Sequence, residues 1–297
     1  MKVVSANECS QFLNSTLVGE NISIRSARSI DSIEEYSLIF LSKRDDVSIE
    51  KINKTQNVLC VATENISEHL TCSVVVHKNP RLAFSMLLQE FFVEGVKPSI
   101  SSMADVHSSA SIGNRVSIGP FCVIGRDVAI GDGTYISSNV VIEGNVTIGE
   151  NCFIKSNTTI GCSGFGFTKN TEGVAVAFPH VGSVVVGDNV EIGANCTVVR
   201  GTLDATKIGD GVKTDDHVHI AHNCVIGKNT FLAASVVLCG SCNVGAEVWI
   251  SPNSTVIDYC TVGDGAFIGL GSVVRKPIAK QARVFGVPAK PIGLRKR

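Results

Sequence analysis

The sequence predicts a mainly β protein: a parallel β-helix of hexapeptide repeats, preceded by a small α/β N-terminal domain and followed by a short C-terminal cap. Aliphatic residues recur at every sixth position from Val106 to Val274, with two interruptions. Neither the 3.6-residue period of a helix nor the two-residue period of a strand produces this spacing. The first hundred residues instead combine short apolar runs with helix-capping signals, and prolines follow the last repeat.

Residues 1–100 are expected to form the α/β domain. Ser5 and Glu8 have the spacing of a capping box, which predicts a short helix. Asn79-Pro80 supplies an N-cap and a first-turn proline for a second helix, which Gly95 and Pro98 should end. Apolar or alternating runs predict strands at residues 22–24, 38–41, 58–62 and 72–76.

Residues 101–275 are expected to form the β-helix. Three six-residue repeats make one triangular coil of 18 residues, with each aliphatic side chain inside and neighbouring coils roughly 4.8 Å apart. A loop insertion at 162–184 contains Phe165, Phe167 and His180, and a second irregularity spans residues 200–207. Insertions in so regular a stack are where function can be housed. Residues 276–297 should form a basic cap.

Composition narrows the class of protein. The 297 residues are 44% hydrophobic, which suffices for a packed core. No apolar run is long enough to span a bilayer, and the N-terminus lacks the apolar core of a signal peptide, so we expect a cytoplasmic protein without a membrane span. The net charge of −1 gives no reason to expect a nucleic-acid partner. However, residues 275–297 hold eight basic side chains and no acid, a composition suited to binding phosphates.

The cysteines are expected to be structural. An odd count of eleven argues against a disulfide framework. Six of them lie four residues after an inward aliphatic position, where a small side chain must fit near a corner: Cys122, Cys152, Cys196, Cys224, Cys242 and Cys260. The spacing of Cys239 and Cys242 is therefore attributed to the core rather than to redox or metal chemistry.

Residues 215–227 gather three of the seven histidines, which suits acid/base chemistry or metal binding. Residues 18 apart share a column, so Gly240 should lie one coil beyond His222, leaving a backbone N–H free to stabilise an oxyanion. With Asp215 or Asp216 orienting its imidazole, His222 would act as general base in acyl transfer from a thioester. Tyr259 is two coils and one position further on.

Four motifs resemble one known family. They are residues 220–227, 163–167, 190–194 and 79–84. Together they are similar to the UDP-acylglucosamine N-acyltransferases of lipid A biosynthesis. This resemblance implies a homotrimer of left-handed β-helices with active sites between subunits, an N-terminal domain that helps bind the uridine nucleotide, and acyl transfer to a sugar amine. It assigns His222 as catalytic base, Asp215 as the supporting acid and Gly240 as the oxyanion donor.

The sequence also departs from that family. Tyr259 stands where the family has a second active-site histidine. Phe40 matches, but Lys43-Arg44 follow where the family usually has uracil-contacting residues. The C-terminal helical extension that helps receive acyl carrier protein is absent, and residues 284–291 resemble the ending of hexapeptide acyltransferases that use coenzyme A.

We therefore predict an N-acyltransferase acting on a nucleotide-linked amino sugar, with acyl-CoA preferred over acyl carrier protein as co-substrate and with no bound cofactor or metal. The close variant is a UDP-acylglucosamine N-acyltransferase that uses acyl carrier protein. The residues expected to contact the substrate are Phe40, Phe165, Phe167, His219 and Tyr259. Those expected to bind the acyl donor are Arg275, Lys276 and Lys290.

Two alternatives come from other classes. Gamma-type carbonic anhydrases share the β-helix and bind zinc through three histidines, two of them five residues apart, like His217 and His222, with His180 as a candidate third. The other alternative is a non-catalytic scaffold that binds a sugar nucleotide, suggested by Tyr259. The sequence does not identify the sugar, the base or the acyl length.

Overall fold

The computed structural model describes residues 3–95 and 97–294, and the chain divides into two compact units, residues 1–96 and 97–297. The basic residues Arg295, Lys296 and Arg297 of the expected cap lie outside the described residues. Within the described ranges, no helix is both long and apolar enough to cross a bilayer.

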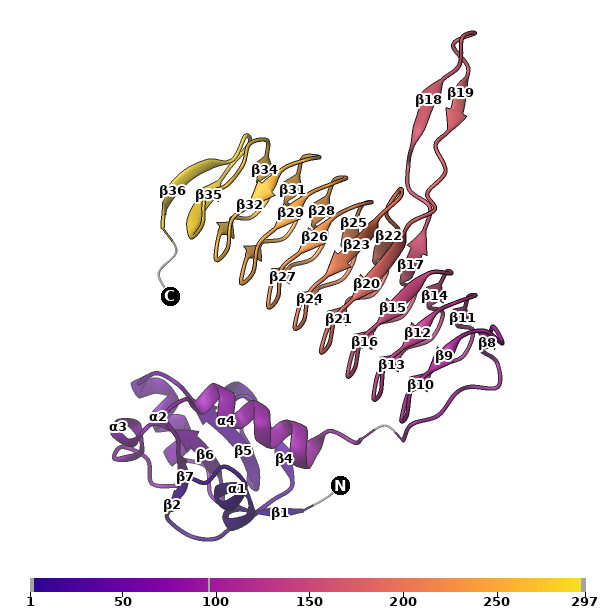
Figure 1. The fold of residues 1–297 in the computed structure, drawn as a ribbon. Helices are drawn as coiled ribbons and strands as arrows, with labels where there is room; N and C mark the ends of the chain where they lie inside the picture. The colour runs from indigo at the N-terminus through magenta and orange to yellow at the C-terminus, as the bar shows by residue number, and fades with distance from the viewer. Residues whose placement is uncertain (1–2, 96, 295–297) are drawn as a thin grey trace. The chain divides into compact units, whose positions relative to one another are not determined.

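The N-terminal unit is built on a five-stranded sheet in the order β2-β7-β6-β5-β4, drawn in indigo and violet in Figure 1. Its strands are β2 (Thr16–Val18), β4 (Ser26–Ala27), β5 (Ser37–Leu41), β6 (Leu59–Ala62) and β7 (Ser73–Val76). Strands β4 to β7 run parallel and β2 runs antiparallel to β7. A separate pair joins β1 (Val4–Ser5) to β3 (Ser23–Ile24).

Helices cover both faces of this sheet. They are α1 (Ala6–Phe12), α2 (Asp46–Asn53), α3 (Glu64–Ser67), α4 (Pro80–Leu87), the π-helical turn η2 (Leu88–Phe92) and the 3-10 turn η1 (Ile30–Ser32). Alternate strand residues face opposite ways: Leu38 packs with α1 and α4, whereas Ile39 packs with α2 and α3. The unit is therefore a three-layer α/β sandwich.

The predicted helix starts are confirmed. Ser5 caps α1 in a reciprocal capping box with Glu8, and the Asn79 side chain caps α4 with Pro80 in its first turn. Helix α4 and the π turn end at Phe92, before Gly95 and Pro98. The sequence did not predict the short elements α2, α3, β2 and β4.

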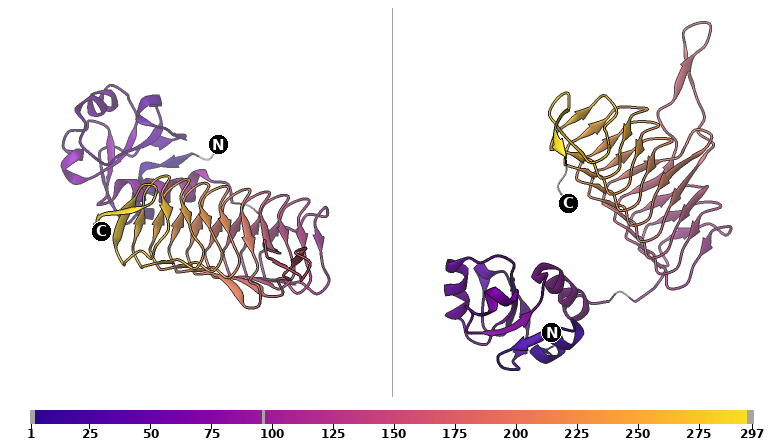
Figure 2. Two further views of the ribbon diagram at one scale, coloured as in Figure 1. Left: turned by 90° about the horizontal axis from the view of Figure 1, so that it is seen from above. Right: turned by 60° about the vertical axis from the view of Figure 1, so that its left-hand side comes forward.

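The second unit winds three parallel sheets into stacked coils (Figures 1 and 2). The first sheet contains β10 (Ser117–Ile118), β13 (Tyr135–Ile136), β16 (Phe153–Ile154), β21 (Glu191–Ile192), β24 (Lys213–Thr214), β27 (Phe231–Leu232), β30 (Trp249–Ile250), β33 (Phe267–Ile268), β35 (Ala282–Phe285) and β36 (Lys290–Leu294). The second contains β8 (Asp105–Val106), β11 (Val123–Ile124), β14 (Val141–Ile142), β17 (Thr159–Cys162), β22 (Thr197–Val199), β25 (His219–Ile220), β28 (Val237–Leu238), β31 (Thr255–Val256) and β34 (Val273–Val274). The third contains β9 (Ser111–Ile112), β12 (Ala129–Ile130), β15 (Val146–Ile148), β20 (Ser183–Val186), β23 (Ala205–Ile208), β26 (Val225–Ile226), β29 (Asn243–Val244) and β32 (Thr261–Val262).

The 18-residue coil is confirmed by the strand register. Ile118 pairs with Ile136, and Val256 pairs with Val274, each 18 residues further on. The second residue of each two-residue strand points inward, so the repeating aliphatic side chains form one continuous buried core. The six corner cysteines are buried in the same core, as predicted, and no disulfide joins any cysteine of the described chain.

Asparagine is common at the corners of the coils. Asn139, Asn157, Asn195 and Asn223 have φ between 54° and 63°, a left-handed conformation that asparagine tolerates better than most residues. The left-handed residue lets the chain turn sharply at the corner and begin the strand of the next sheet.

After both interruptions the chain returns to its column, with one bulge at Gly161 where β17 pairs with β22. Val186 of β20 pairs with Ile148, 38 residues earlier, because residues 163–182 leave the coil and form a hairpin from β18 (Phe167–Lys169) and β19 (Ala175–Ala177). Figure 1 shows this hairpin standing out from the coils. The second interruption, before β23, adds four residues, since Ile208 pairs with Val186 at a spacing of 22.

The C-terminal end differs from the expected cap. The prolines do not stop the sheet at Val274, because β35 adds a parallel strand beside β33 and β36 returns antiparallel to it. Val284 of β35 is still buried in the core. The cap is therefore a β-hairpin that extends the first sheet.

Candidate functional site

The three histidines that are close in sequence are divided among the faces and corners of one coil. His217 lies at the corner between β24 and β25, with φ 62°, and is exposed. His219 lies in β25, and His222 follows at the next corner, between β25 and β26. The cluster seen in the sequence is therefore not a single cluster in space.

His222 and Gly240 lie side by side, as the 18-residue column predicts. A Cβ placed on Gly240 would lie 2.5 Å from Cε1 of His222 and 2.7 Å from Nε2, so only glycine leaves room for this ring. The backbone N–H of Gly240 donates to no other group among the described residues. The next coil continues the column, because the N–H of Tyr259 donates to the Gly240 carbonyl at 2.9 Å.

Asn223 orients the imidazole of His222. Its Oδ1 lies 3.1 Å from Nδ1 of His222. The same oxygen accepts from the N–H of Thr202 at 3.1 Å and from its hydroxyl at 2.9 Å, which identifies it as the acceptor atom of the amide. Nδ1 of His222 therefore carries the hydrogen in the neutral ring. Nε2, beside Gly240, is left with the lone pair that a general base needs.

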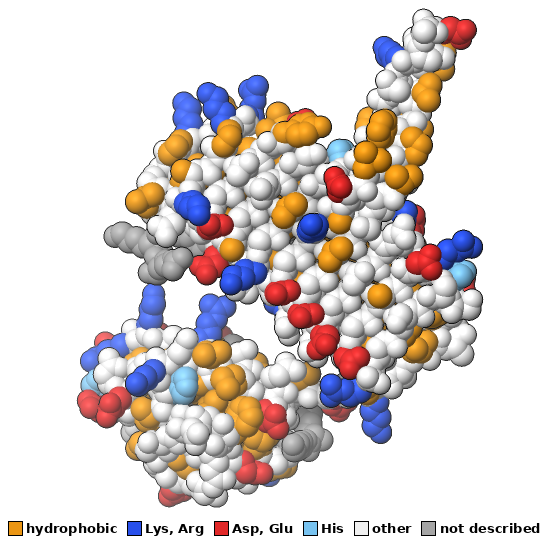
Figure 3. Space-filling view, viewed as in Figure 1, with side chains coloured by type: hydrophobic (Ala, Val, Ile, Leu, Met, Phe, Trp, Pro, Cys, Tyr) orange, Lys and Arg blue, Asp and Glu red, His pale blue; other side chains and the backbone are white. Residues whose placement is uncertain are grey.

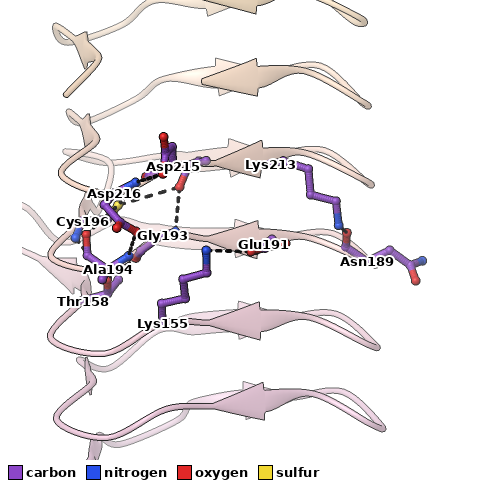
Figure 4. Close-up of polar contacts among 11 residues, drawn as sticks. Lys155, Thr158, Asn189, Glu191, Gly193, Ala194, Cys196, Lys213, Asp215 and Asp216 are labelled. Carbon is purple, nitrogen blue, oxygen red and sulfur yellow. Dashed lines mark hydrogen bonds and ion pairs between the residues drawn. The ribbon is translucent and has the colours of Figure 1, made fainter. Parts of the chain in front are cut away.

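Asp215 does not orient His222 within this chain, which corrects the expected contact. Asp215 follows β24 and His222 follows β25, so the two side chains occupy different corners. Oδ1 of Asp215 accepts from the N–H of Asp216 at 2.9 Å, and Oδ1 of Asp216 accepts from the N–H of Ala194 at 2.7 Å. Figure 4 shows both carboxylates bonded to backbone.

Lys155 lies near this acidic corner, two coils before Asp215 (Figure 4). Its Nζ is 2.9 Å from Oε1 of Glu191. The hydrogen bond to Glu191 raises the pKa of Lys155, and the charges of Asp216 and Asp215 add to the effect. The corner thus carries opposite charges facing one another.

The two insertions meet next to His222. The N–H of Val181, at the base of the hairpin, donates to the carbonyl of Thr202 at 2.8 Å, and the N–H of Arg200 donates to the carbonyl of Cys162 at 3.1 Å. Arg200 also bonds through its side chain to the Gly161 carbonyl. The segment that fixes Asn223 is therefore fixed in turn by the hairpin base.

His180 is brought to the same place. Its ring packs against that of His222 edge to face, with centroids 5.3 Å apart and an angle of 65° between planes. Its side chain is 6% exposed, although most of the hairpin around it is exposed. The sequence suggests His180 only as a candidate third zinc ligand.

The aromatic residues of the inserted loop are on its surface. Phe165 is 91% exposed and Phe167 is 58% exposed, and their rings pack edge to face at 5.0 Å. Figure 3 shows hydrophobic side chains gathered along this hairpin. They are available to a ligand or to another chain.

His219 and Tyr259 have different surroundings. His219 is half-buried in β25, and burial lowers the pKa of its imidazole. Tyr259 is 77% exposed on the coil after Gly240. Neither side chain has a hydrogen bond to His222 in the described part of the chain.

The residues predicted to bind the acyl donor converge. Arg275, Lys276 and Lys290 line one pocket of about 510 Å³, together with Pro277, Ile278, Pro288, Ala289 and Pro291. Lys276 lies in the column of His222, Gly240 and Asp258, because Val256 pairs with Val274 one coil on. Three coil spacings place it roughly 14 Å from the His222 corner. Figure 3 shows basic side chains grouped at this end of the coils.

In the N-terminal unit, Phe40 packs on Phe84 of α4, with ring centroids 4.8 Å apart. Arg44, beyond the end of β5, forms an ion pair with Asp46 at 3.1 Å and lies 3.1 Å from Nε2 of His69. Arg44, Asp46 and His69 line a separate pocket of this unit. Its other polar lining residues are Glu50, Asn53 and Lys54.

The three histidines of the zinc alternative do not meet within the described part of one chain. His180 and His222 are adjacent, but His217 is on a different corner. Nowhere in residues 3–95 or 97–294 do three histidine, cysteine or acidic side chains gather closely enough to hold a metal ion.

Sequence reasoning missed Asn223 and Thr202. Asn223 has the left-handed conformation of many corner asparagines, so nothing in the repeat distinguishes it. Thr202 belongs to the second irregularity, whose position one coil before the histidines was the only signal.

Comparisons with known proteins agree with this architecture. The model of the bacterial transferase hexapeptide (six repeats) matches residues 109–144, 127–162 and 205–240, and that of the hexapeptide repeat of succinyl-transferase matches residues 183–213. UDP-3-O-acylglucosamine N-acyltransferase from Delftia acidovorans is 46% identical over 193 residues, which are 65% of this chain and 56% of that protein. The enzyme of the same name from Bordetella pertussis is 41% identical over 127 residues, 42% of this chain and 35% of that protein. The chain thus matches only about a third to a half of the length of these relatives.

Solved structures with the same coils match a larger share of their own length. UDP-N-acetylglucosamine acyltransferase from Francisella novicida is 34% identical, with a TM-score of 0.60 over 66% of this chain and 70% of that one. UDP-N-acetylglucosamine O-acyltransferase from Moraxella catarrhalis is 31% identical, with a TM-score of 0.61 over 66% and 75%. The shared fold is the predicted left-handed parallel β-helix. The chain therefore belongs to the hexapeptide-repeat acyltransferases, and over part of its length it is similar to the UDP-3-O-acylglucosamine N-acyltransferases.

Proposed function

We propose that this chain is an N-acyltransferase that moves an acyl group from a thioester to the amine of a nucleotide-linked amino sugar. One observation carries the proposal: His222 has its Nδ1 hydrogen fixed by Asn223, while its Nε2 lies beside Gly240, whose N–H is free. A base and an oxyanion donor at one corner are the two groups that acyl transfer to an amine requires.

The chemical steps follow from these positions. As the neutral amine attacks the thioester carbonyl, Nε2 of His222 takes a proton from the nitrogen. The Gly240 N–H stabilises the negative charge that forms on the carbonyl oxygen. When the intermediate collapses, the carbon–sulfur bond breaks, and His222 returns its proton to the leaving sulfur. The products are an amide and a free thiol.

The acyl donor is proposed to be an acyl-CoA, which binds through its phosphates to Arg275, Lys276 and Lys290. These side chains line one pocket, and Lys276 among them lies in the column of His222. Donors based on coenzyme A and on acyl carrier protein both carry the acyl group on a phosphopantetheine arm, which can extend along such a column. Acyl carrier protein is therefore the alternative donor.

The acceptor is proposed to be a UDP-linked amino sugar, because the relatives are named for acylated UDP sugars. Its nucleotide would contact the N-terminal unit near Phe40. Phe165, Phe167, His219 and Tyr259 remain the predicted contacts to the rest of the substrate.

Assembly is proposed to complete the site. Asp215 and His222 lie on different corners of one chain, so Asp215 can support the base only from a neighbouring chain. A homotrimer with sites between subunits would bring the two corners together, with the exposed hairpin aromatics available to the neighbour. A cytoplasmic location belongs to the same proposal, since acyl-CoA and nucleotide sugars are made there.

The test is a thiol-release assay with purified protein, offering nucleotide amino sugars against acetyl-CoA, longer acyl-CoAs and acyl carrier protein. We expect release only when both substrates are present. His222→Ala should lower kcat at least ~10²-fold, as expected for loss of a general base. Gly240→Ala should also lower kcat, because its Cβ would displace the His222 ring. His107→Ala, a change at an exposed histidine of an early coil, is the control.

Normal turnover by the His222 variant would remove this mechanism. Binding of a sugar nucleotide without release of thiol from any donor would favour the non-catalytic scaffold instead.

A further inference from the structure

His180 has a buried side-chain nitrogen that lacks a partner. Its Nδ1 lies 3.1 Å from the carbonyl oxygen of Phe178. A carbonyl can only accept, so Nδ1 carries the hydrogen and Nε2 of the neutral ring carries a lone pair. Nε2 is the one buried side-chain nitrogen or oxygen without a hydrogen-bond partner within residues 3–95 and 97–294.

This arrangement disfavours folding. A buried acceptor that has lost water without gaining a donor is destabilising, and such groups are rare. A phenyl ring would fill nearly the same space without this penalty. A purely structural role in the hairpin base would therefore be better served by phenylalanine.

The ring is held closely on the hairpin side. A Cβ at Gly164 would lie 2.8 Å from Nε2 of His180, and one at Gly166 would lie 2.9 Å from Cε1. The two glycines of the motif at residues 163–167 thus give His180 the space it occupies. On its other side the ring contacts His222, with 5.3 Å between centroids.

We propose that His180 is a positioning residue for His222, and this rests on the proposed function of His222 as the base. His180 holds the His222 ring so that Nε2 stays beside Gly240. When His222 takes a proton from the amine it becomes a cation, and a neutral ring with an unprotonated nitrogen 5.3 Å away between centroids favours that charge. The unprotonated nitrogen of His180 adds a partial negative charge that a phenyl ring lacks.

The test compares His180→Ala with His180→Phe. The alanine variant loses both ring and nitrogen, and its kcat should fall ~10²-fold, the size expected for a misplaced catalytic group. The phenylalanine variant keeps an aromatic ring but loses both nitrogens, the unpartnered Nε2 and the Nδ1 that bonds to the Phe178 carbonyl. Its kcat should fall by about tenfold, a smaller part of the same electrostatic effect. KM for both substrates should stay nearly constant in both variants. His107→Ala is the control for loss of a histidine.

The melting temperature distinguishes a positioning role of His180 from a purely structural one. The melting temperature of His180→Phe should be close to that of the wild type or above it, because removal of the unpartnered Nε2 offsets loss of the Nδ1 hydrogen bond to Phe178. Wild-type kcat in His180→Phe would overturn the role of the nitrogen, and wild-type kcat in His180→Ala would overturn positioning altogether. A loss confined to KM would also overturn it.

A readout independent of turnover distinguishes failure of this inference from failure of the proposed function. The ¹⁵N signals of the His222 imidazole report its tautomer and surroundings in the unliganded protein. They should change in His180→Ala and less in His180→Phe. If the wild type releases no thiol from any donor, the proposed function fails, and unchanged ¹⁵N signals in His180→Ala would independently refute the contact.

Discussion

Asn223 has two roles at one corner of the β-helix. Its left-handed backbone, with φ 60°, turns the chain as asparagine does at other corners. Its side chain also accepts from Thr202 twice and from Nδ1 of His222. A neutral amide oxygen thereby fixes the tautomer of His222, the proposed base, a task often given to a carboxylate. The nearest acids in sequence, Asp215 and Asp216, are engaged by backbone N–H groups instead.

His219 makes stability depend on pH. Burial holds the pKa of its imidazole below the usual 6.5 in the folded chain. As the pH falls below about 6.5, the unfolded chain binds the proton first, so the folded state loses stability until its own imidazole is also protonated.

We therefore expect His219→Gln to show a shallower fall in melting temperature between pH 7 and pH 5 than the wild type, measured by calorimetry. His217→Gln, at an exposed histidine two residues earlier, is the matched control and should follow the wild-type curve. Identical slopes for the wild type and His219→Gln would contradict this assignment.

At the residue scale, the repeat predicted positions but not contacts. The column of His222 and Gly240 followed from counting residues, because the coil has a fixed length. The partner of the imidazole did not, since Asn223 is held by Thr202 in a segment that breaks the count. The contact of His180 with His222 could not be predicted either, because the length of the hairpin that returns His180 to the coil follows no period.

At the scale of elements, the two insertions act as one structure. The base of the hairpin, at residues 181–183, bonds to residues 201–204 of the second irregularity. Arg200 reinforces this contact through the Gly161 carbonyl and an ion pair with Glu143 at 3.4 Å. The chain leaves the repeat twice, and both departures converge on the corner of His222.

The Thr202–Asn223 contact can be tested by a double-mutant cycle. Thr202→Val removes the hydroxyl donor, and Asn223→Gly keeps the left-handed backbone but removes the amide. Each change should lower kcat by about tenfold or less, in line with loss of a single hydrogen bond. The double variant should be little worse than Asn223→Gly alone, because both changes interrupt one chain of contacts. Effects that multiply would mean that the two residues act independently.

Elements were predictable where they were repetitive or well capped. Strands of the coil and the starts of α1 and α4 follow from period and capping residues. The hairpin strands β18 and β19 could not be predicted, since their residues are exposed and follow no apolar period. The C-terminal hairpin was missed because prolines are tolerated at a sheet edge, where an amide hydrogen is not needed.

At the scale of the whole coil stack, the proposed base His222 and Lys276 of the basic pocket lie on one column. Lys276 is three coils from His222, and Lys290 reaches the same pocket from β36. Lys280, by contrast, is paired with Asp264 at 2.9 Å and does not line the pocket. Some basic residues of the C-terminal segment thus line the pocket, whereas Lys280 forms an ion pair outside it.

Lys276→Ala and Lys290→Ala should each raise KM for acyl-CoA by about tenfold, the loss expected for one charged hydrogen bond, with kcat nearly unchanged. Steady-state kinetics with CoA donors at several salt concentrations would measure this, and salt should weaken wild-type binding more than binding by the variants. Lys280→Ala is the matched control. If the two pocket variants bind acyl-CoA normally, the donor phosphates lie elsewhere.

The β-helix and its coil length could be read from the sequence because one period governs the whole stack. The α/β character of the N-terminal unit was also readable from its capping residues and short apolar runs. What lay beyond reach was the meeting of segments that obey no period, and those segments build the surroundings of His222.

The constant spacing of the coils also fixes distances along the stack. No insertion interrupts the coils between His222 and Lys276, so the separation between the proposed base and the basic pocket is set by the number of coils between them. That separation can change only in steps of one coil, roughly 4.8 Å each. A gain or loss of 18 residues between Gly240 and Lys276 would shift the proposed site of the donor phosphates by one coil spacing. The core packing would stay unaltered. Donor reach is thus a countable property of this fold.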